Sequence, residues 1–125
     1  MATILVIEDD LAFRDLLRMH LRQAGYTVQI AEDPEEGLRS LLETPPDLIL
    51  LDLDLPYMSG FELLEAFRSD PTSQKIPVIV VTGHGEEDVH DRCRNIGIDG
   101  FFVKPFKSEH LIQGITKALG ARGEK

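Results

Sequence analysis

The sequence lacks residues that several common classes of protein require. It has one cysteine, Cys93, which excludes an internal disulfide or a cysteine-ligated zinc site and is typical of a reducing compartment. Only 13 Lys and Arg residues oppose 22 Asp and Glu, and the net charge of -9 disfavours direct binding of nucleic acid. No apolar run approaches the length of a membrane span, and residues 1–10 carry acids where a signal peptide needs a basic start. We therefore expect a cytoplasmic domain that binds neither nucleic acid nor membranes and favours cations or basic partners.

Five short apolar runs alternate with helical patterns along the 125 residues. These runs are predicted to be strands and cover Thr3–Ile7, Thr27–Ile30, Leu48–Leu51, Val78–Val81 and Phe101–Val103. Such alternation is typical of an α/β fold with a parallel sheet. Since crossovers between parallel strands are right-handed, we predict a doubly wound, five-stranded parallel sheet of order 2-1-3-4-5 with five helices. Residues 1–120 are expected to form one domain, followed by a polar C-terminal tail at 121–125.

Helix start and stop signals separate the predicted strands. The first helix has apolar residues at helical spacing and ends before Gly25, while Asp33–Glu36 and Ser59–Glu62 have the spacing of capping boxes. The fourth helix, about 86–96, has few apolar residues on its buried stripe, so we predict that it is the most mobile helix. A fifth helix is predicted to begin near residue 108.

Polar residues stand at the carboxyl ends of four predicted strands: Glu8 and Asp9 after the first, Asp52 after the third, Thr82 after the fourth and Lys104 after the fifth. One polar residue after an apolar strand is commonly a helix cap or a turn residue. Five are harder to explain by capping, because parallel strands bring their carboxyl ends to one edge of the sheet, where α/β proteins bind ligands. We therefore predict one site that contains all five.

Three carboxylates at this edge would repel one another unless a cation neutralised them. Oxygen ligands without a cysteine or a histidine pair favour a hard ion, so the predicted cofactor is Mg²⁺ (or Mn²⁺). A carboxylate, a metal ion, a lysine and a hydroxyl are also the groups that phosphoryl transfer requires, since that reaction depends on in-line positioning and on neutralising negative charge. The predicted product is an aspartyl phosphate.

Four segments carry a resemblance to a known family: ILVIEDD at Ile4–Asp10, LLDLDLPYMSG at Leu50–Gly60, VVTGHG at Val80–Gly85 and GFFVKPF at Gly100–Phe106. With these motifs in this order, the chain resembles the receiver domains of two-component response regulators, of the chemotaxis-regulator type, over essentially its whole length. The resemblance implies a flavodoxin-like fold and a signalling switch rather than an enzyme with a separate substrate. The phosphoryl group would come from a histidine kinase or a histidine phosphotransfer protein, and the domain would catalyse only its own phosphorylation and dephosphorylation.

The resemblance also implies which residues hold the phosphoryl group and the metal. Asp52 would be the phosphoacceptor and a metal ligand. Glu8 and Asp9 would form the acidic pair, with Asp9 as the direct ligand. The backbone carbonyl of Asp54 would complete the protein ligands.

Three further residues would respond to the phosphorylation of Asp52. Thr82 would hydrogen-bond the phosphoryl group and Lys104 would neutralise another of its oxygens. Phe101 would occupy an aromatic switch position that turns inward as Thr82 moves. Phosphorylation would change which partner binds the face formed by the fourth helix, the fifth strand and the fifth helix. That partner would be a downstream effector or a second receiver in a phosphorylation-dependent dimer. The bond between Lys104 and Pro105 is expected to be cis.

Some positions depart from the commonest pattern of the family. Asp54 places an acid at the mouth of the site, and Gly83 and His84 follow Thr82 where the family usually begins with Ala. We expect these three residues to tune access to the phosphoryl group, with Asp54 and His84 flanking the path of an attacking water. Phe101 lacks the hydroxyl of a tyrosine, so its switch would work through burial and shape.

Two other classes of protein remain open at this point. Asp52, Leu53 and Asp54 also resemble the DxD start of haloacid-dehalogenase-type phosphatases, in which Asp52 would be the nucleophile and Asp54 a general acid. A flavodoxin-like FMN carrier would share the fold, but the chain has no Trp and offers only Tyr26 and Tyr57 for ring stacking. The sequence is compatible with a stand-alone receiver and with part of a longer regulator.

Overall fold

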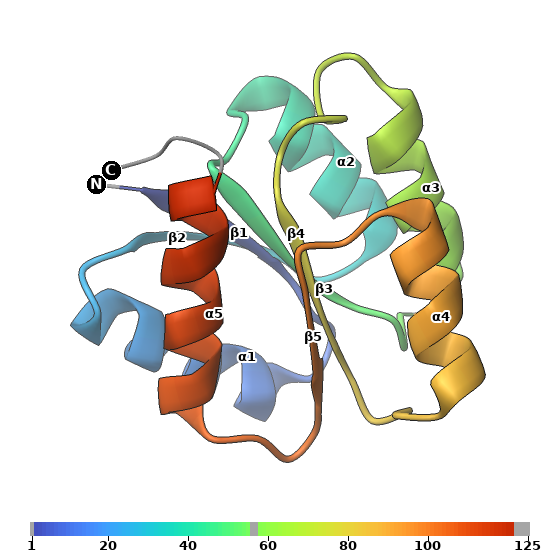
Figure 1. Ribbon diagram of the computed structural model, residues 1–125. Coiled ribbons are helices and arrows are strands. Elements are labelled where there is room, and N and C mark those ends of the chain that lie inside the picture. The colour runs from blue at the N-terminus through green and yellow to red at the C-terminus, as the bar shows by residue number, and fades with distance from the viewer. Residues whose placement is uncertain (1, 56–57, 122–125) are drawn as a thin grey trace.

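The chain forms a parallel sheet with helices on both faces (Figure 1). The computed structural model describes residues 2–55 and 58–121, so Tyr57 and most of the predicted tail lie outside the described residues. The strands are β1 (Thr3–Ile7), β2 (Thr27–Ala31), β3 (Leu48–Asp52), β4 (Val78–Thr82) and β5 (Gly100–Val103). The helices are α1 (Leu11–Gln23), α2 (Pro34–Glu43), α3 (Gly60–Ser69), α4 (Glu87–Ile96) and α5 (Ser108–Ala121). All strand pairs are parallel in the order β2-β1-β3-β4-β5, which confirms the predicted fold class and strand order.

The central strands are buried on both faces because each face is covered by helices. Leu48 and Leu50 of β3 belong to a core cluster shared with α1 and α5. Ile49 and Leu51 belong to a second cluster, shared with α2, α3 and α4. Figure 1 shows the same division, with α1 and α5 on one side of the sheet and the other three helices on the opposite side. This two-sided burial explains why the β3 sequence has no polar alternation.

Two strands extend one residue beyond the predicted range, to a polar residue. Asp52 pairs with Val81 in the ladder between β3 and β4, and Thr82 pairs with Val103 in the ladder between β4 and β5. Asp52 and Thr82 are therefore attached to ladder positions, whereas Glu8, Asp9 and Lys104 follow the ends of β1 and β5. The backbone positions of Asp52 and Thr82 are fixed by the sheet itself.

Side-chain caps start three of the helices. Asp10 accepts a hydrogen bond from the Phe13 N–H at 3.1 Å at the start of α1, and Asp33 accepts one from Glu36 at 2.8 Å at the start of α2. Ser59 caps α3, but its hydroxyl accepts from the N–H of Phe61 at 3.1 Å rather than from the N–H of Glu62, which a capping box would use. Cys93 is the one buried residue of α4, as the short apolar stripe predicts. The mobility of this helix stays a prediction. No helix in the described part of the chain has the length and apolar character needed to cross a membrane.

Gly60 closes the segment that follows the carboxyl end of β3. Its N–H donates to the Leu53 carbonyl oxygen at 3.2 Å. A Cβ atom at this position would lie 2.5 Å from the Leu53 Cα, so the close approach of the two backbones requires glycine. This contact holds the start of α3 against the residue that directly follows Asp52.

Candidate functional site

Three carboxylates meet at the carboxyl edge of the sheet, as the strand order predicts. Since β1 and β3 are neighbours, Glu8 and Asp9 after β1 lie beside Asp52 at the end of β3. One oxygen from each of the three carboxylates lies within 4.8 Å of the others. Glu8 is 1% exposed and Asp52 2% exposed, while Asp9 faces solvent. A hard divalent cation fits this donor set, because all three donors are carboxylate oxygens and one side of the cluster is open to water.

Lys104 brings a positive charge to the same cluster. Its Nζ donates to Glu8 Oε1 and to Asp52 Oδ2, each at 3.1 Å. The backbone N–H of Lys104 donates to the Thr82 carbonyl oxygen at 2.7 Å, which anchors the residue to the end of β4. The peptide bond between Lys104 and Pro105 is cis, as predicted. Burial disfavours the charged ammonium, but the charge of Asp52 and the hydrogen bonds to Asp52 and Glu8 outweigh this effect and raise the pKa of Lys104.

The buried position of Glu8 changes its protonation. Burial raises the pKa of Glu8 from 4.5 to about 7, helped by the hydrogen bond to Asp52 and by the negative charge of Asp52. The Asp10 N–H, which donates to Glu8 Oε2 at 3.1 Å, and the ammonium of Lys104 act in the opposite direction. The single positive charge of Lys104 therefore does not neutralise the three carboxylates. Binding of a second cation or of a proton would reduce the remaining negative charge.

Asp52 is held from two sides. Its Oδ2 accepts from Lys104, and its Oδ1 accepts from the backbone N–H of Asp54 at 2.9 Å. Thr82 is fully buried at the end of the adjacent strand β4, and its Oγ1 accepts from the His84 N–H at 3.1 Å. The structure thus joins Lys104 to Glu8 and Asp52 by hydrogen bonds, places Asp9 within 4.8 Å of both carboxylates, and sets Thr82 on the neighbouring strand.

Asp54 and His84 form a pair beside the acidic cluster of Glu8, Asp9 and Asp52. His84 Nε2 lies 3.2 Å from Asp54 Oδ1, and His84 Nδ1 lies 3.9 Å from Glu86 Oε1. Gly83, which precedes His84, has nothing within 4 Å of the place that a Cβ would occupy, so open space surrounds it. The sequence places Asp54 and His84 near the same opening but gives no signal that they contact each other. The pair joins the segments that follow β3 and β4.

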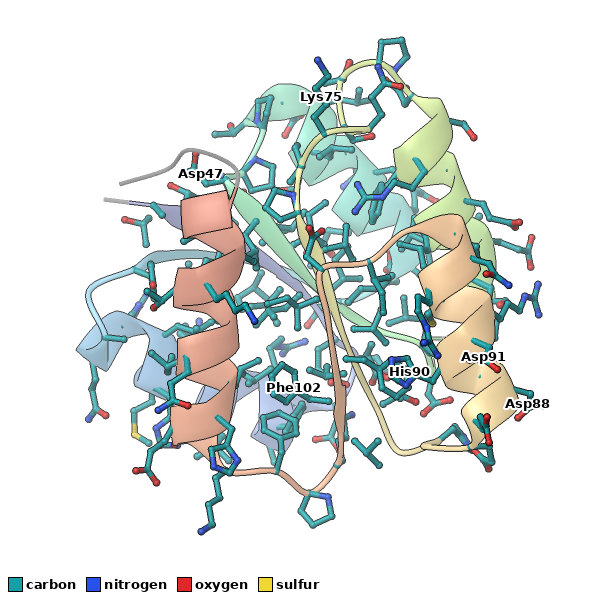
Figure 2. The ribbon with its side chains drawn as sticks, viewed as in Figure 1. Asp47, Lys75, Asp88, His90, Asp91 and Phe102 are labelled. Atoms are coloured by element: carbon teal, nitrogen blue, oxygen red, sulfur yellow. The ribbon has the colours of Figure 1, made fainter. Side chains whose placement is uncertain are left out.

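Phe101, the predicted switch residue, is half-buried and stacks on a histidine of α4. The rings of Phe101 and His90 lie 4.3 Å apart at an interplanar angle of 8°. Figure 2 shows His90 directed from α4 towards β5. The sequence gives no signal for the contact of His90, because this contact depends on how α4 packs against β5. An aromatic ring thus connects the last strand of the site to the least buried helix.

The fold and the site define a doubly wound α/β domain with an acidic cluster at the carboxyl edge of its sheet. The sequence matches the response regulator receiver domain family over residues 4–116, and the chain belongs to this family. Receiver domains are phospho-accepting signalling switches, so the class predicted from the four motifs is confirmed.

Individual relatives support the same assignment. The chain is 34% identical over 121 residues to the phosphate regulon transcriptional regulatory protein PhoB of Pseudomonas aeruginosa, covering 97% of this chain and 53% of that protein. It is 30% identical over 119 residues to a probable chemotaxis protein CheY of Rhizobium etli, covering 94% and 92%. The crystal structure of a CheY-like receiver domain protein from Methanospirillum hungatei matches with a TM-score of 0.92 and 31% identity, covering 98% and 97%. The chain spans about half the length of the transcriptional regulators that it matches.

Proposed function

We propose that this chain is a Mg²⁺-dependent receiver that takes a phosphoryl group onto Asp52 from a phosphohistidine of a histidine kinase or a phosphotransfer protein. The observation that carries this proposal is the environment of Asp52. This carboxylate is 2% exposed, lies 3.1 Å from the Lys104 ammonium, and shares a cluster within 4.8 Å with Glu8 and Asp9. A buried carboxylate beside a cation and two further acids suits a nucleophile that must stay ionised while it accepts a phosphoryl group.

The transfer step follows from these positions. An oxygen of Asp52 attacks the phosphorus in line, the bond from phosphorus to the donor imidazole breaks, and its electron pair returns to the imidazole nitrogen. Lys104 neutralises charge on the phosphoryl oxygens, and Thr82 offers its hydroxyl to another oxygen. When bound, Mg²⁺ neutralises the carboxylates and a phosphoryl oxygen, with Asp9, Asp52, Glu8 and the Asp54 carbonyl as its proposed ligands.

Binding of Mg²⁺ is expected to weaken as the pH falls below 7. The pKa of Glu8 is raised to about 7, so the folded protein without metal binds a proton that the unfolded chain releases near 4.5. The contribution of Glu8 to folding stability is therefore fully present below pH 4.5 and is lost as the pH rises through about 7. A cation at the cluster favours ionised Glu8, so its binding releases that proton, and its affinity should fall about tenfold per unit of pH well below 7.

Titration calorimetry with Mg²⁺ between pH 5.5 and 8 measures this dependence. Glu8→Gln is the control, since it is expected to bind Mg²⁺ more weakly but with little dependence on pH over this range. An affinity of the unsubstituted protein that stays constant across the range would contradict the assignment of Glu8.

The pair of Asp54 and His84 is proposed to limit the access of water to the phosphorylated site. Both side chains are about half exposed, so we expect the pair to restrict the entry of water only weakly. We expect His84→Ala to speed loss of the phosphoryl group about two- to fivefold, the range to which an exposed polar contact worth about 0.5–1 kcal/mol corresponds. Single-turnover dephosphorylation in Mg²⁺ measures the rate. His110→Ala, which removes an exposed histidine from α5, is the control, and a slower loss in His84→Ala would refute this role.

Output is proposed to pass through Phe101 and α4. Inward movement of Thr82 towards the phosphoryl group would free space for the Phe101 ring, and the stack on His90 would transmit the ring's movement to α4. The face of α4, β5 and α5 would then favour one effector or a second receiver. Identical Phe101 rotamers in crystals with and without beryllofluoride, an analogue of the phosphoryl group, would argue against this route.

The function is tested by incubating the protein with Mg²⁺ and radiolabelled acetyl phosphate. We expect one phosphoryl group per chain, and a panel of phosphohistidine proteins from the same genome would then identify the donor by transfer rate. Steady release of phosphate from a phosphomonoester, without a stoichiometric labelled protein, would instead favour the haloacid-dehalogenase-type phosphatase.

A further inference from the structure

The Lys104 ammonium has an aromatic neighbour in addition to its carboxylate partners. Its Nζ lies 4.3 Å from the centre of the Phe13 ring, a distance typical of a cation–π contact. Phe13 is in the first turn of α1, and its N–H is bound by the cap residue Asp10 at 3.1 Å. The start of α1 therefore places an apolar ring beside the lysine of the acidic cluster.

Further aromatic residues fix the orientation of this ring. Phe13 and Phe106 make an edge-to-face contact with centres 5.8 Å apart at 83°. Phe106 follows Lys104 by two residues and also packs against Phe102 of β5, again at 5.8 Å. Figure 2 shows Phe102 on the side of β5 that faces α5, away from His90. The three rings thus tie α1 to the segment that carries Lys104.

The two kinds of Lys104 contact differ in what competes with them. Both hydrogen bonds go to Glu8 and Asp52, the same carboxylates that are proposed to hold Mg²⁺. A divalent cation at these oxygens would repel the ammonium and take its acceptors. The ring of Phe13 offers no ligand atom to Mg²⁺, so this contact is available to the ammonium in either state.

We propose that Phe13 is a positioning residue that keeps the Lys104 ammonium at the acidic cluster when a metal ion occupies the carboxylates. The inference rests on the proposed function of Asp52, because its consequence is a Lys104 that is already in place for the incoming phosphoryl group. Without the ring, Lys104 is a flexible side chain that must be ordered during the transfer.

The kinetic test compares Phe13→Leu with Phe13→Tyr at saturating Mg²⁺ and acetyl phosphate. We expect Phe13→Leu to slow labelling about tenfold, and Phe13→Tyr, which keeps a ring, to restore at least half of the rate. Phe61→Leu is the matched control, because Phe61 also lies in the first turn of a helix but faces Arg92, at 4.0 Å, rather than Lys104. Failure of Phe13→Tyr to restore the rate would overturn the proposal.

A double-mutant cycle separates positioning from packing. If Phe13 acts through Lys104, Phe13→Leu has no further effect in a Lys104→Met background. If it acts by packing against Phe106, the slowing persists in that background, and the proposal is wrong.

Nuclear magnetic resonance supplies a test that needs no phosphorylation. The Hε protons of Lys104, assigned by comparison with Lys104→Met, are expected to show an upfield ring-current shift that persists when Mg²⁺ is added. Loss of this shift with Mg²⁺ would overturn the proposal even if Asp52 is labelled normally. Persistence of the shift in a protein that cannot be labelled would show that the proposed function, rather than the contact, had failed.

Discussion

Asp52→Asn is expected to abolish labelling by acetyl phosphate, with a loss on the order of a thousandfold or more. The amide has nearly the same shape, and its oxygen can still accept from the Asp54 N–H, but it is a far weaker nucleophile than a carboxylate. The substitution removes one negative charge that raises the pKa of Glu8 and also weakens the contact with Lys104, so its two effects on stability oppose each other. Loss of labelling in a folded protein would report chemistry rather than stability.

A neighbouring carboxylate provides the control for this experiment. Asp10 directly follows the acidic pair but caps α1, and asparagine also caps helices well. We expect Asp10→Asn to be labelled at a rate close to that of the unsubstituted protein, which intact mass spectrometry and gel autoradiography both measure. Full labelling of Asp52→Asn would mean that another residue is the acceptor.

Asp52 also shows why so much of the fold could be predicted from the sequence. The residues before it alternate between two core clusters on opposite faces of the sheet, so a continuous apolar run was the expected pattern for β3. Right-handed crossovers then leave few strand orders, and the order 2-1-3-4-5 makes β1 and β3 neighbours. Backbone topology alone therefore brings Glu8 and Asp9 to Asp52.

The contacts around the acidic cluster could not be predicted in the same way. Asp54 meets His84, Phe101 meets His90, and Phe13 meets Lys104. Each pair joins two elements whose relative placement depends on helix packing and on side-chain rotamers, which leave no periodic pattern in the sequence. The sequence thus predicted which strand ends meet at one edge of the sheet, while the structure shows which side chains lie beside them.

Lys104→Met is expected to have two effects of opposite sign. Labelling of Asp52 should fall about a hundredfold, the usual loss when one group that stabilises developing charge is removed. Affinity for Mg²⁺ should instead rise severalfold, because the ammonium no longer occupies Glu8 and Asp52, and the three carboxylates lose their positive neighbour. A variant that simply unfolded the site would lose both properties together. Calorimetry with Mg²⁺ and labelling kinetics on the same preparation distinguish these outcomes.

Lys107→Met serves as the control for total charge. Lys107 is exposed and lies three residues beyond Lys104, so its loss changes the net charge of the chain equally without removing an ion pair at the cluster. Long-range attraction of Mg²⁺ to a more acidic protein would raise the affinity of both variants alike and would weaken with salt. A gain confined to Lys104→Met would instead assign the effect to direct competition at Glu8 and Asp52. Weaker binding of Mg²⁺ by Lys104→Met than by the unsubstituted protein would mean that Lys104 supports the metal site. The proposal that Lys104 and Mg²⁺ compete for Glu8 and Asp52 would then be wrong.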